Sequence, residues 1–364
     1  MLLVAAVLGS NSYSQVGPRA SISGLVIDAS TKKPLPYAIV FLAGTTLGTP
    51  ADSAGRFEIK NVPLGSHELV VSMIGYKRQS FPLQIFEPSK KTLNVQLQPS
   101  EVQTEAVEVV APDPKEWRKN LERFQREFFG ETKNATACQI LNKELLNFQV
   151  DEKKKIFIAT APVPLDMENR ALGLKIRLWL EEFKMDGSIL QYRGTTQFEF
   201  LQPSSSKEGE EWRASRRKAY FGSRRHFLTA LAQGRVKAEG FEVYQVVNIR
   251  SINTATEVGR LPVDVSTFVN RTEYDFQKRL RFTDYLQVVY QREIPEPAFE
   301  ILMNLDNLNY RQQVSWITMN TGSVYFTVEG NTLEPYALKV FGYWAFERVA
   351  ELLPLDYDPN DDKK

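Results

Sequence analysis

The chain has 364 residues, with 45 Lys and Arg against 44 Asp and Glu, which gives a formal net charge of +1. This near balance argues against a dedicated nucleic-acid-binding protein, because such proteins normally carry a strong basic excess. Hydrophobic residues make up 43% and charged residues 24%, an ordinary globular composition that argues against disorder throughout the chain. The length allows two or three domains.

The amino terminus reads as a targeting signal. Leu2–Leu8 is a short apolar run, and the small residues Ser12 and Ser14 suit cleavage before Gln15, so residues 1–14 are predicted to be a signal peptide. Because no Lys or Arg precedes the apolar run, we expect the signal to be incomplete at its start. A buried amino-terminal strand is the less favoured interpretation. The run is shorter than the roughly 20 residues that span a bilayer, and no later stretch approaches that length, so no transmembrane segment is predicted in the mature chain.

Residues 20–99 show the pattern of a β-sandwich, with short apolar runs separated by turns. Ser21–Asp28 is the first predicted strand. Tyr37–Leu42 is the second, and because it is apolar on both faces we expect it to lie inside its sheet. Asp52–Gly55 is a turn in which the carboxylate caps backbone amides and the glycine tolerates a positive φ.

Five ordered motifs in this stretch resemble the carboxypeptidase-like regulatory domain. They are Ser23–Asp28, Pro34–Ala38, Asp52–Phe57, Val62–His67 and Ser72–Tyr76. The resemblance implies a transthyretin-like (Ig-like, prealbumin-like) sandwich of about seven strands. Such domains accompany zinc carboxypeptidases, and in Bacteroidetes-type bacteria they also precede outer-membrane receptors and many envelope proteins. The domain itself is usually noncatalytic.

The rest of the chain is predicted to be a larger, β-rich α+β domain, so the fold class is mainly β. A linker is expected at 100–112, the α+β domain at 113–355 and a polar, disordered tail at 356–364.

Three local signals position elements inside this domain. Asp113 and Pro114 predict the start of a helix, and Gly130 predicts its end. The pair Asp186-Gly187 predicts a long hairpin. A helical stretch from 208 to 233 is interrupted near Gly222, and a short amphipathic helix is expected near the end of the domain.

The larger segment also resembles uncharacterised Bacteroidetes envelope proteins that carry a similar sandwich at the front. The phrases that carry this resemblance are Pro164–Asn169, Tyr220–Leu228 and Gly342–Arg348. It implies a location and an architecture but no reaction.

Few residues are available for catalysis or metal binding. Cys138 is the one cysteine, and His67 and His226 are the two histidines, which excludes cysteine zinc clusters and three-histidine sites. No GxSxG, P-loop, GxGxxG or HExxH motif occurs. A zinc carboxypeptidase would need two histidine ligands in the larger domain, which contains only His226. We therefore expect no catalytic residues, no metal and no cofactor.

Two formal possibilities for catalysis remain, and neither is favoured. A nucleophile with a histidine base would have to use His226 or His67, for example Cys138 with His226, but a buried structural thiol is the favoured interpretation. Paired acids such as Glu181-Glu182 are adjacent, so on a strand they point to opposite faces rather than across one cleft.

The most distinctive cluster is basic. Lys207–Lys237 contains nine Lys or Arg residues against three Glu, interleaved with aromatic residues. Arginine forks beside aromatic rings suit phosphate, carboxylate or acidic-glycan recognition. A solvated helix face whose arginines pair with acids elsewhere is the favoured alternative. The candidate anion- or partner-binding residues are Arg213, Arg216, Arg217, Arg224 and Arg225.

These observations predict an exported, noncatalytic binding or assembly protein of the cell envelope, located in the periplasm or associated with the outer membrane or cell surface. Its expected partner is an envelope protein or a surface glycan, and not a nucleic acid. A sandwich edge could accept a partner strand. The alternative is an exported hydrolase of unrecognised type that acts on peptide or glycan.

Overall fold

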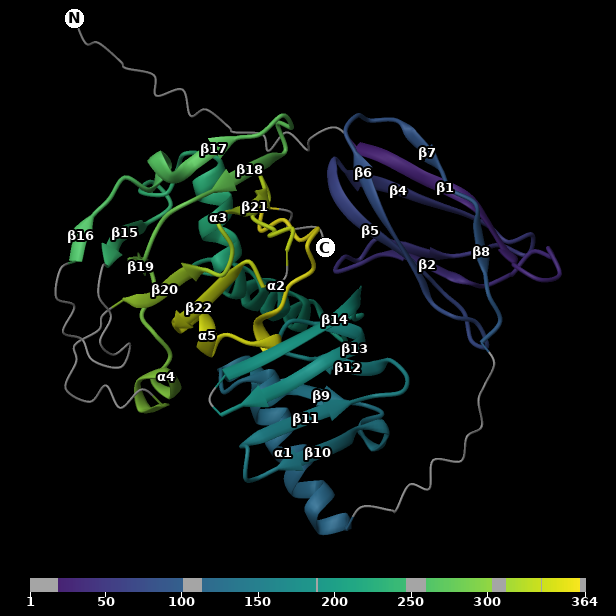
Figure 1. The fold of residues 1–364 in the computed structure, drawn as a ribbon, viewed down its shortest axis with the longest axis horizontal. Coiled ribbons are helices and arrows are strands. Elements are labelled where there is room, and N and C mark those ends of the chain that lie inside the picture. The colour runs from purple at the N-terminus through teal and green to yellow at the C-terminus, as the bar shows by residue number, and fades with distance from the viewer. Residues whose placement is uncertain are drawn as a thin grey trace, which may run out of the picture.

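A computed structural model describes residues 19–100, 113–187, 189–246, 260–302, 312–334 and 336–360. The predicted signal peptide and most of the predicted linker lie outside these residues. The fold is mainly β, as predicted. Figure 1 shows an amino-terminal sandwich beside a larger part that is built around two separate groups of sheets. None of the described helices is long and apolar enough to span a bilayer.

The sandwich consists of two sheets that enclose one hydrophobic core. One sheet has the order β4-β1-β7, with β8 also pairing with β1, and the other has the order β3-β2-β5-β6. Its strands are β1 (Arg19–Asp28), β2 (Ile39–Leu42), β3 (Gly48–Pro50), β4 (Arg56–Pro63), β5 (Gly65–Ser72), β6 (Gln79–Ile85), β7 (Lys90–Thr92) and β8 (Val95–Leu97). The sandwich inferred from short apolar runs is confirmed.

The strand β2 lies between β3 and β5, as its double-sided apolar pattern predicts. Val40 and Leu42 face the sandwich core. Phe41 points the other way and is still 0% exposed, because its ring stacks on Trp179 of the larger domain with the ring centroids 5.1 Å apart.

We call the part built from residues 114–200 the first lobe. Its sheet has the order β10-β11-β13-β12-β9, and β14 pairs with β13. Its elements are α1 (Pro114–Phe129), η1 (Lys133–Ala137), β9 (Cys138–Ile140), η2 (Lys143–Leu145), β10 (Asn147–Asp151), β11 (Ile156–Thr160), β12 (Leu165–Asn169), β13 (Leu174–Asp186) and β14 (Ile189–Phe200). The long hairpin predicted at Asp186-Gly187 is the β13–β14 pair.

The helix α1 begins and ends where the sequence predicts. The Asp113 carboxylate accepts the backbone N–H of Lys115, and Gly130 follows the last turn with φ at 87°. Phe124 and Phe128 are fully buried against the sheet, where the Phe124 ring meets Phe183 edge-on at 4.7 Å.

We call the part built from residues 224–342 the second lobe. It contains a sheet of order β16-β15-β19-β20-β22 and a smaller sheet of order β17-β18-β21, which share a core with the helix α3. Its elements are α3 (Arg224–Ala232), β15 (Phe241–Val246), β16 (Arg260–Pro262), η3 (Val265–Phe268), β17 (Val269–Arg271), β18 (Gln277–Leu280), β19 (Tyr285–Tyr290), α4 (Pro297–Leu302), β20 (Gln313–Met319), β21 (Val324–Thr327) and β22 (Leu338–Gly342).

The lobes are joined by α2 (Ser206–Tyr220) and by the end of the chain. The predicted break near Gly222 separates α2 from α3, and this glycine has φ at 80°. The amphipathic helix expected near the end is instead two short turns, α5 (Tyr343–Phe346) and η4 (Val349–Glu351). They are separated at Glu347, which forms a bridge to Gly130 of the first lobe.

The segment after η4 differs from the disordered tail expected from residue 356. The Asp356 carboxylate accepts the backbone N–H of Thr46 at 2.9 Å and its hydroxyl at 2.6 Å. Tyr357 packs against the core of the first lobe. The polar composition of this segment predicted disorder. That prediction is wrong for Asp356, because its partner Thr46 lies 310 positions away in the sequence and leaves no local signal.

Backbone hydrogen bonds attach one end of the sandwich to the first lobe and to this segment. The N–H of Gly44 donates to the carbonyl of Thr196 at 2.7 Å, and the N–H of Phe198 donates to the carbonyl of Thr45 at 3.0 Å. From the other side, the N–H of Leu355 donates to the carbonyl of Gly44 at 2.7 Å. The loop 43–46 is therefore held between β14 and the carboxy-terminal segment.

Candidate functional site

Three of the five candidate arginines lie on α2, and Arg224 and Arg225 begin α3. Arg216 is only 4% exposed. Its Nη1 donates to the carbonyl of Leu172 at 2.8 Å, and its guanidinium lies 5.0 Å from the centre of the Phe200 ring. Burial lowers the pKa of Arg216. This side chain supports the packing of α2 on the first lobe.

Arg225 is also directed inward. Its guanidinium donates to four carbonyl oxygens, with the carboxy-terminal acceptors at 2.6 to 2.9 Å and the turn acceptor at 3.2 Å. The acceptors are those of Glu329, Pro354, Leu355 and Tyr357. An arginine has five N–H donors. Most of those of Arg225 bind the carboxy-terminal segment, which in turn is hydrogen-bonded to loop 43–46.

The other three candidate arginines differ in how far they are exposed to solvent. Arg217 is exposed on α2, with its guanidinium 6.0 Å from the Phe221 ring, whereas Arg213 and Arg224 are half-buried. Burial lowers the pKa of Arg224. Arg216 and Arg225 thus bind carbonyls of the chain itself, and the binding of a partner by the predicted cluster stays a prediction.

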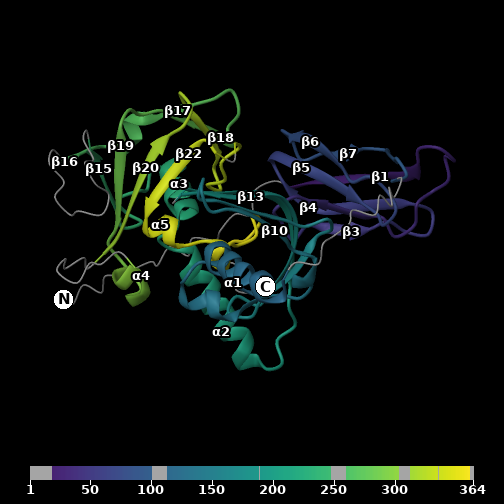
Figure 2. The same ribbon diagram turned by 60° about the horizontal axis from the view of Figure 1, so that its bottom comes forward.

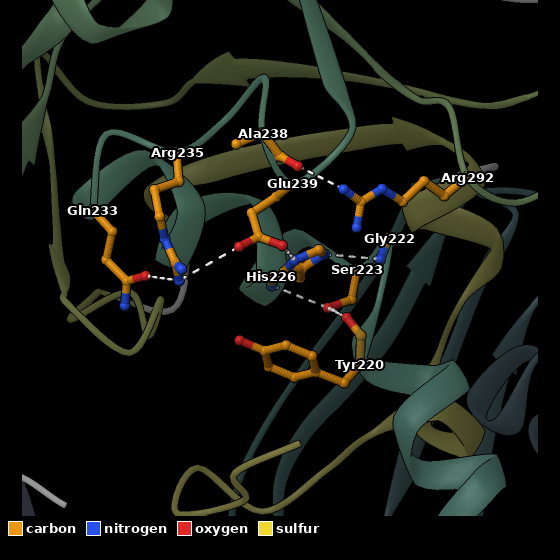
Figure 3. A network of polar contacts seen from close by, with 9 residues as sticks. All are labelled: Tyr220, Gly222, Ser223, His226, Gln233, Arg235, Ala238, Glu239 and Arg292. Carbon is orange, nitrogen blue, oxygen red and sulfur yellow. Dashed lines mark hydrogen bonds and ion pairs between the residues drawn. The ribbon is translucent and has the colours of Figure 1, made fainter. Parts of the chain in front are cut away.

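His226 lies at the centre of a polar network between α3 and β15 (Figure 3). The backbone N–H of Gly222 donates to His226 Nδ1 at 3.1 Å, so the proton of the neutral ring sits on Nε2. That nitrogen faces Glu239 Oε2 at 3.5 Å. Arg235 contacts the other oxygen of Glu239 at 3.4 Å. The network therefore occupies both ring nitrogens.

This arrangement does not match a nucleophile–base pair. A base must keep one ring nitrogen for the nucleophile. Ser223, the hydroxyl in the network, accepts the backbone N–H of His226 and donates to the carbonyl of Tyr220, and it does not bind the ring. His226 is 3% exposed, and burial lowers its pKa.

The other two residues considered for catalysis are also placed in structural contacts. His67 Nε2 bonds the carbonyl of Pro63 at 2.8 Å, and burial lowers its pKa. Burial raises the pKa of the Cys138 thiol to about 12. A thiolate is the reactive form of cysteine, so this thiol is a poor nucleophile near neutral pH.

A pocket that no sequence pattern indicated lies at the junction of the lobes. Its volume is about 110 Å³, and four glutamates line it together with two lysines and several neutral polar residues. The lining residues are Lys133, Asn134, Ser215, Lys218, Glu293, Glu296, Gln313, Tyr343, Glu347 and Glu351.

Two of these glutamates are tied to the first lobe. Glu351 accepts the Thr132 hydroxyl at 2.5 Å and the Asn134 amide at 2.8 Å. Glu296 accepts the backbone N–H of Lys133 at 2.8 Å. These bonds connect η1 with the β19–α4 connection and with η4.

Glu347 differs, because burial raises its pKa well above the ordinary glutamate value and the carboxylates of Glu351 and Glu293 raise it further. Burial also raises the pKa of Glu293 and of Glu351. Carboxyl groups whose pKa values are raised by burial are of the kind that serve in general acid–base chemistry.

The size of the pocket limits what it can hold. Typical small-molecule sites have volumes of about 300–1,000 Å³, so this one has room for a few waters or a small group rather than for a sugar ring. Within the described ranges, no group of three or more His, Cys, Asp or Glu side chains is placed to hold a metal ion.

Residues 22–109 match the family model of the CarboxypepD_reg-like domain. This match includes the whole run of sandwich motifs and confirms the resemblance that those motifs predict. No curated protein matches the chain.

Solved structures give only weak likenesses. A chain of a type II cohesin–X-dockerin complex from Acetivibrio cellulolyticus is 22% identical over 22% of this chain and 58% of its own, with a TM-score of 0.19. The major pilin subunit of Bacillus cereus is 14% identical over 23% and 31%, with a TM-score of 0.21. A 3-chlorocatechol 1,2-dioxygenase from Rhodococcus opacus is 12% identical over 23% and 61%, with a TM-score of 0.19. The similar region is thus less than two thirds of each of these chains, and the low scores carry no argument about function.

Proposed function

We propose that this chain is an exported, noncatalytic binding or assembly protein of the cell envelope that contacts an envelope protein or a surface glycan. One observation carries the proposal: the two histidines and the cysteine, which were the candidates for nucleophilic catalysis, lie in settings that do not suit that role. Both ring nitrogens of His226 are occupied, His67 is bonded to a carbonyl, and the Cys138 thiol has a raised pKa. The CarboxypepD_reg-like domain supports export to the envelope, where such domains are common.

The fixed attachment of the sandwich also supports a binding role. Backbone bonds from loop 43–46 and the Phe41–Trp179 stack hold the sandwich in one orientation. A binding surface that is already ordered loses less entropy when a partner arrives. Strand addition at a sandwich edge stays a prediction, and Pro82 in the edge strand β6 lacks the backbone donor that a paired strand would use.

Crosslinking of the tagged full chain in cells, followed by mass spectrometry of envelope fractions, tests the proposal. We expect one dominant envelope partner, and we expect the double variant Arg213→Glu/Arg217→Glu to lose that crosslink. Lys207→Glu is the matched control, because Lys207 is an exposed cation on the same helix. Recovery only from the cytosol would contradict export.

The hydrolase alternative rests on the acidic pocket and the raised pKa of Glu347. If it is correct, Glu347→Gln abolishes hydrolysis of peptide or glycan substrates and leaves the crosslinked partner unchanged. If the binding proposal is correct, the natural chain shows no hydrolysis on either substrate panel. The small volume of the pocket favours the binding proposal.

A further inference from the structure

We propose that the end of the sandwich opposite loop 43–46 is a tip that docks on an anionic lipid surface. Two large apolar side chains are presented there. Tyr37 lies two residues before β2 and Ile74 lies two residues after β5. Because Ile39 pairs with Ser72 in the antiparallel β2–β5 ladder, both side chains emerge at the same end of this sheet.

These two side chains are unusually exposed for their types. Ile74 is 99% exposed and Tyr37 is 73% exposed. Single exposed apolar residues are common on protein surfaces. Here two large apolar side chains are exposed at the same end of one pair of strands. In both views the purple connection between β1 and β2 lies on the side of the sandwich away from the lobes (Figures 1 and 2).

The backbone at Tyr37 is strained in a way that maintains this exposure. Its φ is 64°, a left-handed conformation that bulky residues rarely adopt. Its N–H donates to the carbonyl of Ala51 at 3.0 Å, which fixes the loop in place. Strained backbone that persists in a folded protein is concentrated at functional positions. Here the strain holds an aromatic ring in solvent.

The charge around the two side chains is basic. Lys32, Lys33 and Lys77 are exposed in the same loops. These loops contain no acidic residue, and Asp52 of the nearby β3–β4 turn is paired with Arg56 at 3.3 Å. Lysines beside a protruding apolar point suit a surface with anionic groups above an apolar layer.

A lipid surface fits this shape better than a protein partner does. Stable protein interfaces bury about 800 Å² on each side, which is much more than two side chains at loop tips provide. In a bilayer the aliphatic chain of Ile74 would enter the apolar layer, and the Tyr37 ring would sit at headgroup level, where tyrosines are enriched. The lysines would bind anionic headgroups. This inference does not depend on the proposed envelope partner.

Vesicle flotation with the full chain tests the inference. We expect binding to phosphatidylcholine vesicles that contain about 30% phosphatidylglycerol, and much weaker binding to vesicles of phosphatidylcholine alone, because the lysines respond to anionic lipid. The expected binding is weak and reversible, since only two apolar side chains insert. Higher salt should weaken it.

Two variants test the tip directly. Ile74→Ser and Tyr37→Gly should each weaken vesicle binding roughly tenfold, because each removes a large apolar side chain. Ile294→Ser is the matched control, because Ile294 is 74% exposed in the second lobe and should not affect binding. Near-ultraviolet circular dichroism verifies that the variants are folded.

Three outcomes would overturn the inference. The first is that the natural chain does not bind anionic vesicles. The second is that Ile74→Ser binds them as well as the natural chain does. The third is that Ile294→Ser weakens binding as much as Ile74→Ser, which would assign the membrane contact to the second lobe. In the first case, the crosslinking experiment is repeated with Ile74→Ser. If this variant loses the crosslink to the envelope protein, the tip contacts a protein partner instead of lipid.

Discussion

The two ends of the sandwich carry similar short loops but differ in what those loops contact. At one end, loop 43–46 is bonded on both sides, by β14 and by the carboxy-terminal segment. At the other end, Tyr37 and Ile74 extend into solvent. Phe41, the aromatic residue at the docked end, is fully buried, whereas Tyr37 at the opposite end is mostly exposed.

This difference shows how one small domain can be both a structural part and a contact surface. The docked end supplies apolar area and backbone groups that the larger domain uses, so changes there should affect the folding of the whole chain. At the other end the Tyr37 and Ile74 side chains are mostly exposed, so changes to these two side chains should alter binding with little effect on stability.

Phe41→Ala should have the largest effect. Truncating a fully buried phenylalanine typically costs about 3–5 kcal/mol, and here it also removes the stack on Trp179. Urea denaturation should show the loss, and the sandwich should unfold in a step separate from the lobes. Ile74→Ala is the matched control and should change the free energy of unfolding by less than about 0.5 kcal/mol. Equal effects of the two variants would contradict the contrast between the ends.

Arg225→Ala should have the next largest effect, about 2–3 kcal/mol, because it removes several charge-assisted hydrogen bonds to backbone carbonyls. The amides of residues 44–46 should then exchange hydrogen faster, since the segment that holds them loosens. Arg225→Lys keeps the charge but lacks the planar fork, so it should recover only part of the stability. Arg213→Ala should leave exchange at residues 44–46 unchanged, and a change there would mean that the attachment does not run through Arg225.

The role of Arg225 shows where prediction from the sequence ends. The density of arginines between residues 207 and 237 was visible, but the choice between a partner and the chain itself depends on carbonyls more than 100 positions away. Local signals performed better. The carboxylate of Asp113, the ring of Pro114 and the positive φ of Gly130 act within a few residues, so the limits of α1 could be read directly.

The acidic pocket was missed for the same reason. Glu293 and Glu347 are more than 50 positions apart in the sequence, and the phrase Gly342–Arg348 that contains Glu347 implied no reaction. Only the packing of the lobes brings them together and raises their pKa values. In contrast, the sandwich was predictable because its turns and alternating strands lie within one continuous stretch of about 80 residues.

The docked end should also depend on pH through His67. Burial lowers its pKa, so the folded chain binds a proton less readily than the unfolded chain, whose histidine pKa is about 6.5. The stability contribution is therefore complete above about pH 6.5 and is lost as the pH falls toward the lower folded value. His67→Gln should show a smaller drop in melting temperature between pH 7.5 and pH 5.0 than the natural chain.

His226 also makes the folded chain less stable as the pH falls, because burial lowers its pKa too. His226→Gln is therefore the comparison variant, and each single variant should keep part of the drop. If His67→Gln shows the full drop of the natural chain, the docked end does not contribute to the pH dependence.

The smallest expected change in stability is at Tyr37 and Ile74. There the informative result is whether the glycine or the alanine variant is the more stable. At ordinary backbone positions glycine is less stable than alanine by about 0.5–1 kcal/mol. At Tyr37, where φ is 64°, an alanine keeps the left-handed strain and a glycine relieves it. We expect Tyr37→Gly to be more stable than Tyr37→Ala by up to about 1 kcal/mol, and Ile74→Gly to be less stable than Ile74→Ala. Urea denaturation of the four variants measures both differences. The same sign at both positions would mean that the loop at Tyr37 relaxes in solution, and the exposed ring would then lose its fixed position.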